Sequence, residues 1–104
     1  MLVIYVEEIP ILRKRPRRRN RLDVVFDVLG VVEAGVDRPT KIMFAANISW
    51  VVLKEILSDL QKRGLIEVMS KGGRTHVKIT ARGKEMLNAY REFESVLEEE
   101  RLSA

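Results

Sequence analysis

The residues with the clearest chemical potential in this sequence are cations, and many of them fall in two groups. Lys and Arg occupy most positions between Arg13 and Arg21. A second group surrounds the pair Gly72-Gly73 and comprises Lys71, Arg74 and Lys78. Guanidinium and ammonium groups at this density bind phosphate oxygens and displace counterions when they do so. The two groups therefore favour a polyanionic partner such as duplex DNA.

Three further residues, Ser49, Trp50 and Lys54, have side chains suited to the groove of a duplex. Serine and lysine bind phosphates or base edges, and tryptophan packs on a sugar or a thymine methyl group. None of the three is a bidentate base reader such as arginine opposite guanine. This combination favours phosphate-dominated binding with weak sequence specificity. The structural alternatives are a half-buried packing role for Trp50 and an ordinary surface position for Lys54.

The net charge of +4 is unevenly distributed along the chain. The segment from Glu92 to Glu100 is rich in glutamate and has no basic residue, so an acidic end faces away from the polyanion that the basic end binds. Arg17, Arg18 and Arg19 lie in the basic run and are candidates for an arm along the backbone or in a minor groove. The alternative for such a run is a solvated tail.

Metal, cofactor and enzymatic chemistry find little support in the composition. The chain has no cysteine, and its one histidine, His76, has no second imidazole to share a metal. The carboxylates are scattered, with no nucleophile–histidine pair and no phosphate-binding loop. We therefore expect no enzyme, no cofactor, no metal site and no small-molecule ligand.

The apolar opening of the chain, residues 1–12, is a poor membrane or export signal. It is interrupted by Glu7, Glu8 and Pro10, and it is shorter than the roughly 20 apolar residues of a membrane span. It also lacks a basic segment ahead of the apolar run and a small-residue cleavage site. We expect no membrane partner and a cytoplasmic, nucleoid-associated location. Within this opening, residues 2–6 favour a short strand.

Hydrophobic periodicity predicts the elements that position these side chains. Asn20 is a plausible N-cap, and the apolar residues after it recur at helical spacing, which predicts a helix over 21–34. Gly35 is well placed to end this helix. The modest helix propensity of its many valines means that burial must supply most of its stability.

Two further helices, separated by a short turn, are expected next. A short helix is predicted over 41–46, with Thr40 as its N-cap. An amphipathic helix follows over 49–63, and both Asn47 and Ser49 are able to cap it. In a helix-turn-helix the second helix enters the major groove with its N-terminal residues toward the base edges. This arrangement places the groove-binding candidates at the required end.

A β-hairpin and a long helix complete the pattern. Two strand-like runs at 65–69 and 75–79 flank Gly72-Gly73, whose positive φ angles suit a tight turn. Thr80 is expected to cap a last helix over 81–102. Together the elements predict an α+β winged helix-turn-helix, with a three-helix core and a β-hairpin wing.

The last helix carries an apolar seam with heptad-like spacing. Its members are Met86, Tyr90, Phe93 and Leu97. The far end of this seam has few partners available within so small a domain, so we expect it to pair with a second copy, in parallel or antiparallel orientation. The chain then divides into an N-terminal strand and basic arm (1–20), a DNA-binding domain (21–80) and a dimerisation helix (81–104).

Three phrases occur in order between residues 40 and 87: TKIMFAANISW, LKEILSDLQKRGLIE and KITARGKEML. They resemble the small archaeal winged-helix proteins regarded as predicted transcriptional regulators, a family that includes dimeric, chromatin-associated DNA-binding proteins. The resemblance covers about three fifths of the chain, from Leu22 to the start of the last helix. It implies DNA binding through residues 49–63 and the wing, and a last helix that pairs with its copy, commonly as an antiparallel coiled coil.

Three functions remain open from the sequence. The first is a homodimeric regulator of transcription that binds DNA through the helix at 49–63, the wing at 70–78 and the basic arm at 13–21. The second is an abundant chromatin protein of low sequence specificity. The third is a winged-helix module for protein contacts, in which Leu2–Val6 adds a strand to a partner.

Overall fold

A computed structural model describes residues 20–103, with side chains described as far as residue 99. The predicted strand at 2–6 and the arginines 17–19 of the predicted arm lie outside the described residues. Three helices come first in the chain: α3 (Arg21–Glu33), α4 (Pro39–Ala46) and α5 (Trp50–Lys62). An antiparallel hairpin, β1 (Ile66–Lys71) and β2 (Arg74–Ile79), leads into the long helix α6 (Ala81–Ser103). This order confirms the predicted winged helix-turn-helix.

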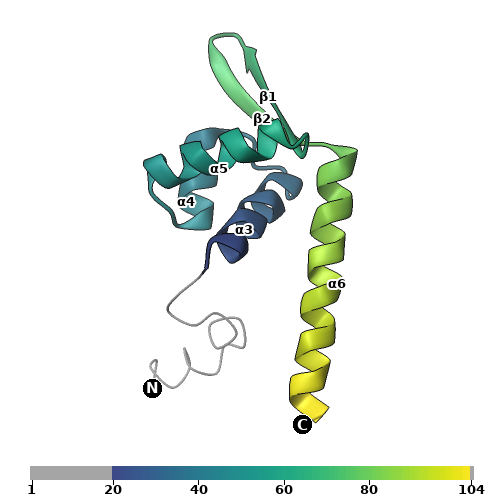
Figure 1. The fold of residues 1–104 in the computed structure, drawn as a ribbon. Helices are drawn as coiled ribbons and strands as arrows, with labels where there is room; N and C mark the ends of the chain where they lie inside the picture. Colours follow the sequence, from purple (N-terminus) through teal and green to yellow (C-terminus); the bar gives the residue numbers. More distant parts are fainter. Residues whose placement is uncertain (1–19, 104) are drawn as a thin grey trace.

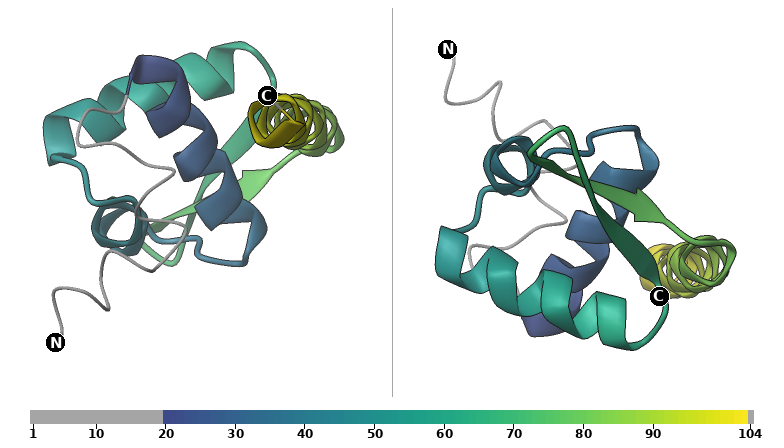
Figure 2. Two further views of the ribbon diagram at one scale, coloured as in Figure 1. Left: turned by 90° about the horizontal axis from the view of Figure 1, so that it is seen from below. Right: turned by 90° about the horizontal axis from the view of Figure 1, so that it is seen from above.

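The hairpin and α6 both project from the three-helix body. The hairpin extends to one side of α3, α4 and α5, and α6 runs in another direction, so that its second half passes beyond the other described helices (Figure 1). Seen along its axis, α6 stands at the edge of the molecule beside α3, and α4 lies on the other side of α3 (Figure 2). The hairpin and the far half of α6 are therefore the two most open parts of the fold.

The core forms where the apolar stripes of the helices meet the base of the hairpin. Leu29 of α3, Ile42 of α4, and Leu53 and Ile56 of α5 have no exposed surface. Leu87 of α6 is also buried, at 2% exposure. Burial of such side chains supplies the main favourable free energy of folding. The first half of α6 thus belongs to the same core as the three-helix body.

The helix starts follow local side-chain chemistry. Asn20, Ser49 and Thr80 each accept a hydrogen bond from the backbone N–H three residues later, at 2.8, 3.2 and 3.0 Å respectively. All three predicted caps are confirmed. Each satisfies a backbone donor that has no partner within the helix.

The start of α4 differs from the prediction. This helix begins at Pro39, with Arg38 at the N-cap position and no side-chain cap, so the predicted Thr40 cap is wrong. Proline suits the first helical position because its fixed φ is helical and its missing N–H has no partner there in any case. Asn47 caps the end of α4 in the left-handed conformation, with φ 57°, and leaves the cap of α5 to Ser49.

The hairpin is tighter than predicted. Pairing continues from Ile66–Ile79 at the base to Lys71–Arg74 at the tip, so that only Gly72 and Gly73 form the loop. Both glycines have positive φ, 58° and 76°, as a two-residue turn of this kind requires. The strands therefore extend to the turn, whereas the sequence pattern placed their ends earlier.

The junction between β2 and α6 is tightly packed. Thr80 alone separates the two elements, and its hydroxyl donates a hydrogen bond of 2.7 Å to the Gly64 carbonyl oxygen. One turn later, Gly83 lies so close to the loop before β1 that an added Cβ would fall 2.2 Å from the carbonyl oxygen of Leu65. The first turn of α6 consequently has one well-defined position against the hairpin base.

Candidate nucleic-acid interface

Helix α5 presents one face to the core and an open face to solvent. Leu53, Ile56 and Leu60 are buried and fall on one side of the helix. With about 100° of rotation per residue, the open side carries a mixed set of exposed residues: Val51, Lys54, Glu55, Ser58 and Lys62. This composition is apolar at the N-terminal turn and polar along the remaining turns.

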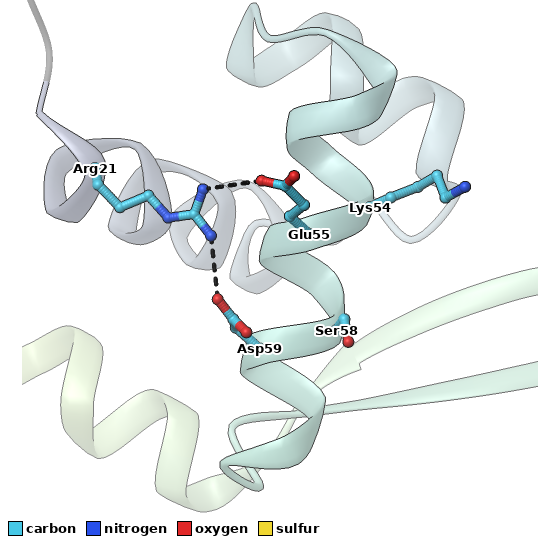
Figure 3. A pocket seen from close by; sticks show the side chains of 5 residues that line it. All are labelled: Arg21, Lys54, Glu55, Ser58 and Asp59. Carbon is cyan, nitrogen blue, oxygen red and sulfur yellow. Dashed lines mark hydrogen bonds and ion pairs between the residues drawn. The ribbon is translucent and has the colours of Figure 1, made fainter.

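The three residues predicted to contact DNA on this helix lie near its N-terminal end. The Ser49 side-chain oxygen caps the helix by accepting the Val52 N–H. Trp50 keeps 45% of its surface exposed, a result between the packing and the DNA-contacting interpretations of this residue. Lys54 is exposed and extends away from Arg21 (Figure 3).

An ion-pair cluster joins the start of α3 to the side of α5. The guanidinium of Arg21 lies 3.5 Å from Glu55 and 3.1 Å from Asp59, measured from Nη1 to Oε1 and from Nη2 to Oδ2. The three residues line a shallow recess with Lys54 and Ser58 (Figure 3). Because these side chains are half exposed or more, the cluster contributes little to stability. Its larger effect is to neutralise part of the negative charge on α5.

The wing gathers its cations on one face. Side chains alternate along a strand, and directly paired residues share a face. In the observed register Lys71 pairs with Arg74, and Lys78 pairs with Glu67. The three predicted wing cations therefore lie on the same face of the hairpin, and all three are exposed. The opposite face carries Val77, which is buried in the core.

The wing is fastened to the loop between α3 and α4 by two contacts. The Val77 N–H donates to the Asp37 carbonyl oxygen at 2.8 Å, and His76 Nδ1 lies 3.0 Å from Asp37 Oδ2. The hydrogen bond with His76 holds the pKa of the Asp37 carboxyl below its ordinary value. His76, which lies within the predicted strand run 75–79, thus ties the wing to the loop between α3 and α4.

We predict that the Asp37–His76 contact makes the wing base acid-sensitive. A carboxyl whose pKa is lowered on folding adds stability that is complete above the unfolded pKa and is lost as the pH falls through the folded pKa. The substitution His76→Phe is expected to raise the pKa of Asp37 toward its ordinary value in an NMR titration of the carboxyl carbon. Met69→Ala, at the cross-strand neighbour of His76, serves as control and leaves this pKa low. An unchanged pKa in His76→Phe contradicts the assigned cause.

The predicted seam on α6 is divided between two directions. Met86, Phe93 and Leu97 are exposed by 44%, 61% and 43%. Tyr90, by contrast, is turned toward its own domain, where its ring stacks on Phe26 with the ring centroids 4.0 Å apart. The Tyr90 hydroxyl lies 2.8 Å from an Asp23 carboxylate oxygen. The open face therefore excludes Tyr90.

Burial raises the pKa of the Tyr90 phenol well above its ordinary value, and its hydrogen bonds with Asp23 and Glu94 raise it further. The phenol therefore remains protonated and can donate to a carboxylate.

Val96, at 52% exposure, lies on the open side of the helix near Phe93. The open face of α6 is defined here as Met86, Phe93, Val96 and Leu97.

A family model described as winged helix-turn-helix matches residues 18–98 of this chain. The chain belongs to the winged helix-turn-helix family. The match begins ahead of α3 and ends within the second half of α6. It therefore takes in α5, the hairpin and the open face of α6.

This winged helix-turn-helix protein has archaeal relatives. It is 26% identical over 85 residues to the uncharacterized protein MJ0287 of Methanocaldococcus jannaschii, which covers 82% of this chain and 84% of the relative. The structure of Sso10a-2, a DNA-binding protein from Sulfolobus solfataricus, matches with a TM-score of 0.71 and 24% identity, over 82% of this chain and 88% of that chain. The predicted resemblance to archaeal winged-helix proteins is confirmed.

A second solved structure from Sulfolobus solfataricus is also similar. The transcriptional regulator BldR matches with a TM-score of 0.67 and 19% identity, over 77% of this chain and 60% of that chain. At these identities the structural matches establish the shared fold.

Among residues 20–103 of this winged helix-turn-helix protein, no helix has the length and apolarity needed to cross a membrane. Over the same residues, no group of three metal-ligating side chains comes together.

The structure adds site residues that the sequence analysis did not select. Val51 and Glu55 lie on the open face of α5, and Arg21, the last residue of the basic run, is paired with carboxylates of α5. The position of Val51 follows from helical phase, because it is four residues before Glu55 and seven before Ser58. The contact of Arg21 with Asp59 spans 38 residues, and no sequence pattern indicates it.

Proposed function

We propose that this protein binds duplex DNA as a homodimer and regulates transcription, with α5 in the major groove and the wing against the adjacent backbone. The observation that carries the proposal is the common orientation of Lys71, Arg74 and Lys78 on one exposed face of the hairpin. Three cations on a two-stranded ribbon form a surface that complements phosphates. The residues 17–19 of the basic run add a proposed arm along the backbone or in the minor groove.

Dimerisation in this proposal uses the open face of α6. Phe93 is 61% exposed on a helix that runs beyond the other described helices (Figure 1). A contiguous apolar face of this kind is a usual mark of a protein interface. A second copy of the same helix offers a complementary apolar surface, and a two-fold axis brings the same patch of each copy together. Residues 81–104 are thus the proposed dimerisation segment.

A salt titration of DNA binding tests the proposal directly. The logarithm of the binding constant is expected to fall linearly with the logarithm of salt concentration. Arg74→Ala is expected to reduce the slope by about 1, the effect of one lost phosphate contact. Arg91→Gln is the matched control, because Arg91 lies on α6 and pairs with Glu33 at 2.9 Å. Equal salt slopes for the wild type and Arg74→Ala would contradict a phosphate contact by the wing.

A chromatin protein of low sequence specificity is the second candidate. It is favoured by the open face of α5, whose residues include no Arg, Asn or Gln among Val51, Lys54, Glu55, Ser58 and Lys62. The planar guanidinium of Arg and the amide groups of Asn and Gln match the paired acceptors and donors of guanine or adenine, whereas the ammonium groups of Lys54 and Lys62 are point charges with less geometric specificity. Footprinting on genomic fragments separates the two candidates. Discrete protected sites support a regulator, whereas uniform protection supports the chromatin protein.

A further inference from the structure

The N-terminal turn of α5 is unusually apolar for a surface that faces DNA. Val51 is 65% exposed and Trp50 is 45% exposed. Outside α6, the large hydrophobic residues that are exposed among the described residues are Leu22, Phe44, Trp50, Val51 and Met69. Three of these five lie between residues 44 and 51, within the helix-turn-helix itself. Single exposed apolar residues are common, but this concentration falls at the end of the helix that approaches the bases.

The direction of Val51 follows from the packing of its helix. Leu53 and Ile56 are fully buried, and Val51 is two residues before Leu53, about 200° around the helix axis. It is four residues before Glu55, and therefore on the same face. In a helix-turn-helix, residues of this turn contact base edges. Val51 is thus the residue of α5 that projects farthest from the core at the reading end.

An isopropyl group can recognise only one feature of the major groove. It neither donates nor accepts a hydrogen bond, so the donors and acceptors of the four base pairs give it no favourable contact. The C5-methyl group of thymine is the one apolar group that a base edge presents in the major groove. Methylation of cytosine at C5 places the same group at the corresponding position. A valine at this site therefore favours pyrimidines that carry a C5-methyl group.

We propose, on the basis of the proposed DNA-binding function, that Val51 reads C5-methyl groups in the major groove. The preferred ligands are then duplexes rich in thymine or carrying 5-methylcytosine. The cationic side chain of Lys54, one turn later on the exposed side of α5, supplies attraction to phosphate that does not depend on the methyl group. In this proposal Val51 supplies the preference for methylated pyrimidines, and Lys54 supplies an affinity that is the same for every sequence.

Four short alternating duplexes test this inference, and they differ in pairs by a single methyl group on each pyrimidine. They are d(A-T) against d(A-U), and d(G-5-methyl-C) against d(G-C). The methylated member of each pair is expected to bind about fourfold more tightly for each methyl group contacted, the value of one buried methyl-sized group. Val51→Ser is expected to bring both ratios close to one. This exposed position tolerates serine without a loss of fold, which a thermal unfolding measurement verifies.

Lys54→Ala is the matched control on the same helix. It is expected to weaken binding to all four duplexes and to leave both ratios unchanged. Equal binding of methylated and unmethylated duplexes by the wild type overturns the inference while the proposed DNA-binding function stands. Ratios that persist in Val51→Ser also overturn it, since another residue then reads the methyl group. Absence of binding to every duplex rejects the proposed function together with the inference.

Discussion

Replacing Gly83 by alanine is expected to lower the free energy of unfolding by about 2–3 kcal/mol, the upper range for overpacking a well-packed site. The added Cβ would lie 2.2 Å from the Leu65 carbonyl oxygen and 2.7 Å from Cγ1 of Ile79. The first of these atoms belongs to the backbone and cannot rotate away. Relief of the contact therefore requires the first turn of α6 to move away from the hairpin base.

Gly30→Ala is the matched control for this substitution, because Gly30 is also inside a helix. An alanine Cβ at position 30 meets only the end of the Arg91 side chain, at 3.5 Å, which is an ordinary contact. Alanine is favoured over glycine in a helix interior by about 1 kcal/mol, so Gly30→Ala is expected to stabilise the protein. Denaturant unfolding of both variants at one protein concentration measures the two effects. A Gly83→Ala variant as stable as Gly30→Ala would contradict the close packing of α6 on the hairpin base.

Phe93→Glu is expected to weaken self-association by about 100-fold or more. The substitution removes an apolar side chain worth about 1.5–3 kcal/mol when buried, and a two-fold interface contains it twice. It also places a charge where the partner offers an apolar surface, and desolvating that charge adds a further cost. Analytical ultracentrifugation over a range of protein concentrations measures the change in the dissociation constant.

Asn88→Glu provides the control for charge on the same helix. Asn88 is exposed and lies five residues from Phe93, roughly on the opposite side of α6. It adds the same carboxylate without touching the open face, and self-association is expected to remain close to that of the wild type. A wild-type protein that stays monomeric at high concentration would reject the proposed dimer. Equal weakening by both variants would assign the effect to net charge and not to the apolar face.

Local features of the fold were predictable from sequence because neighbouring residues determine them. The caps at Asn20, Ser49 and Thr80 depend on a side chain and an N–H three residues away. The turn at Gly72-Gly73 depends on φ angles that glycine adopts without strain. The start of α4 was misplaced because Thr40 and Pro39 both favour a helix start, and periodicity does not rank two adjacent signals.

Long-range features of the candidate site were not predictable in the same way. Heptad spacing on α6 identifies apolar residues but not the surface that each one meets, so Tyr90 was grouped with Phe93 although its ring stacks on Phe26. Arg21 belongs to a basic run in sequence, and only the fold brings it beside Asp59. The common face of Lys71 and Arg74, by contrast, follows directly from the hairpin register once the turn is known.

The single-residue junction at Thr80 also has a mechanical consequence. β2 ends at Ile79 and α6 begins at Ala81. Because only one residue connects them, the hairpin and the long helix have a well-defined relative orientation. In the proposed dimer, the crossing point along α6 then sets the separation of the two hairpins. Sliding that crossing point by one helical turn moves each hairpin by about 5.4 Å relative to the two-fold axis, so that in an antiparallel pair their separation changes by about twice that distance. If the proposed dimer binds DNA, the length of α6 between the hairpin and the crossing point would therefore determine the spacing between the two half-sites.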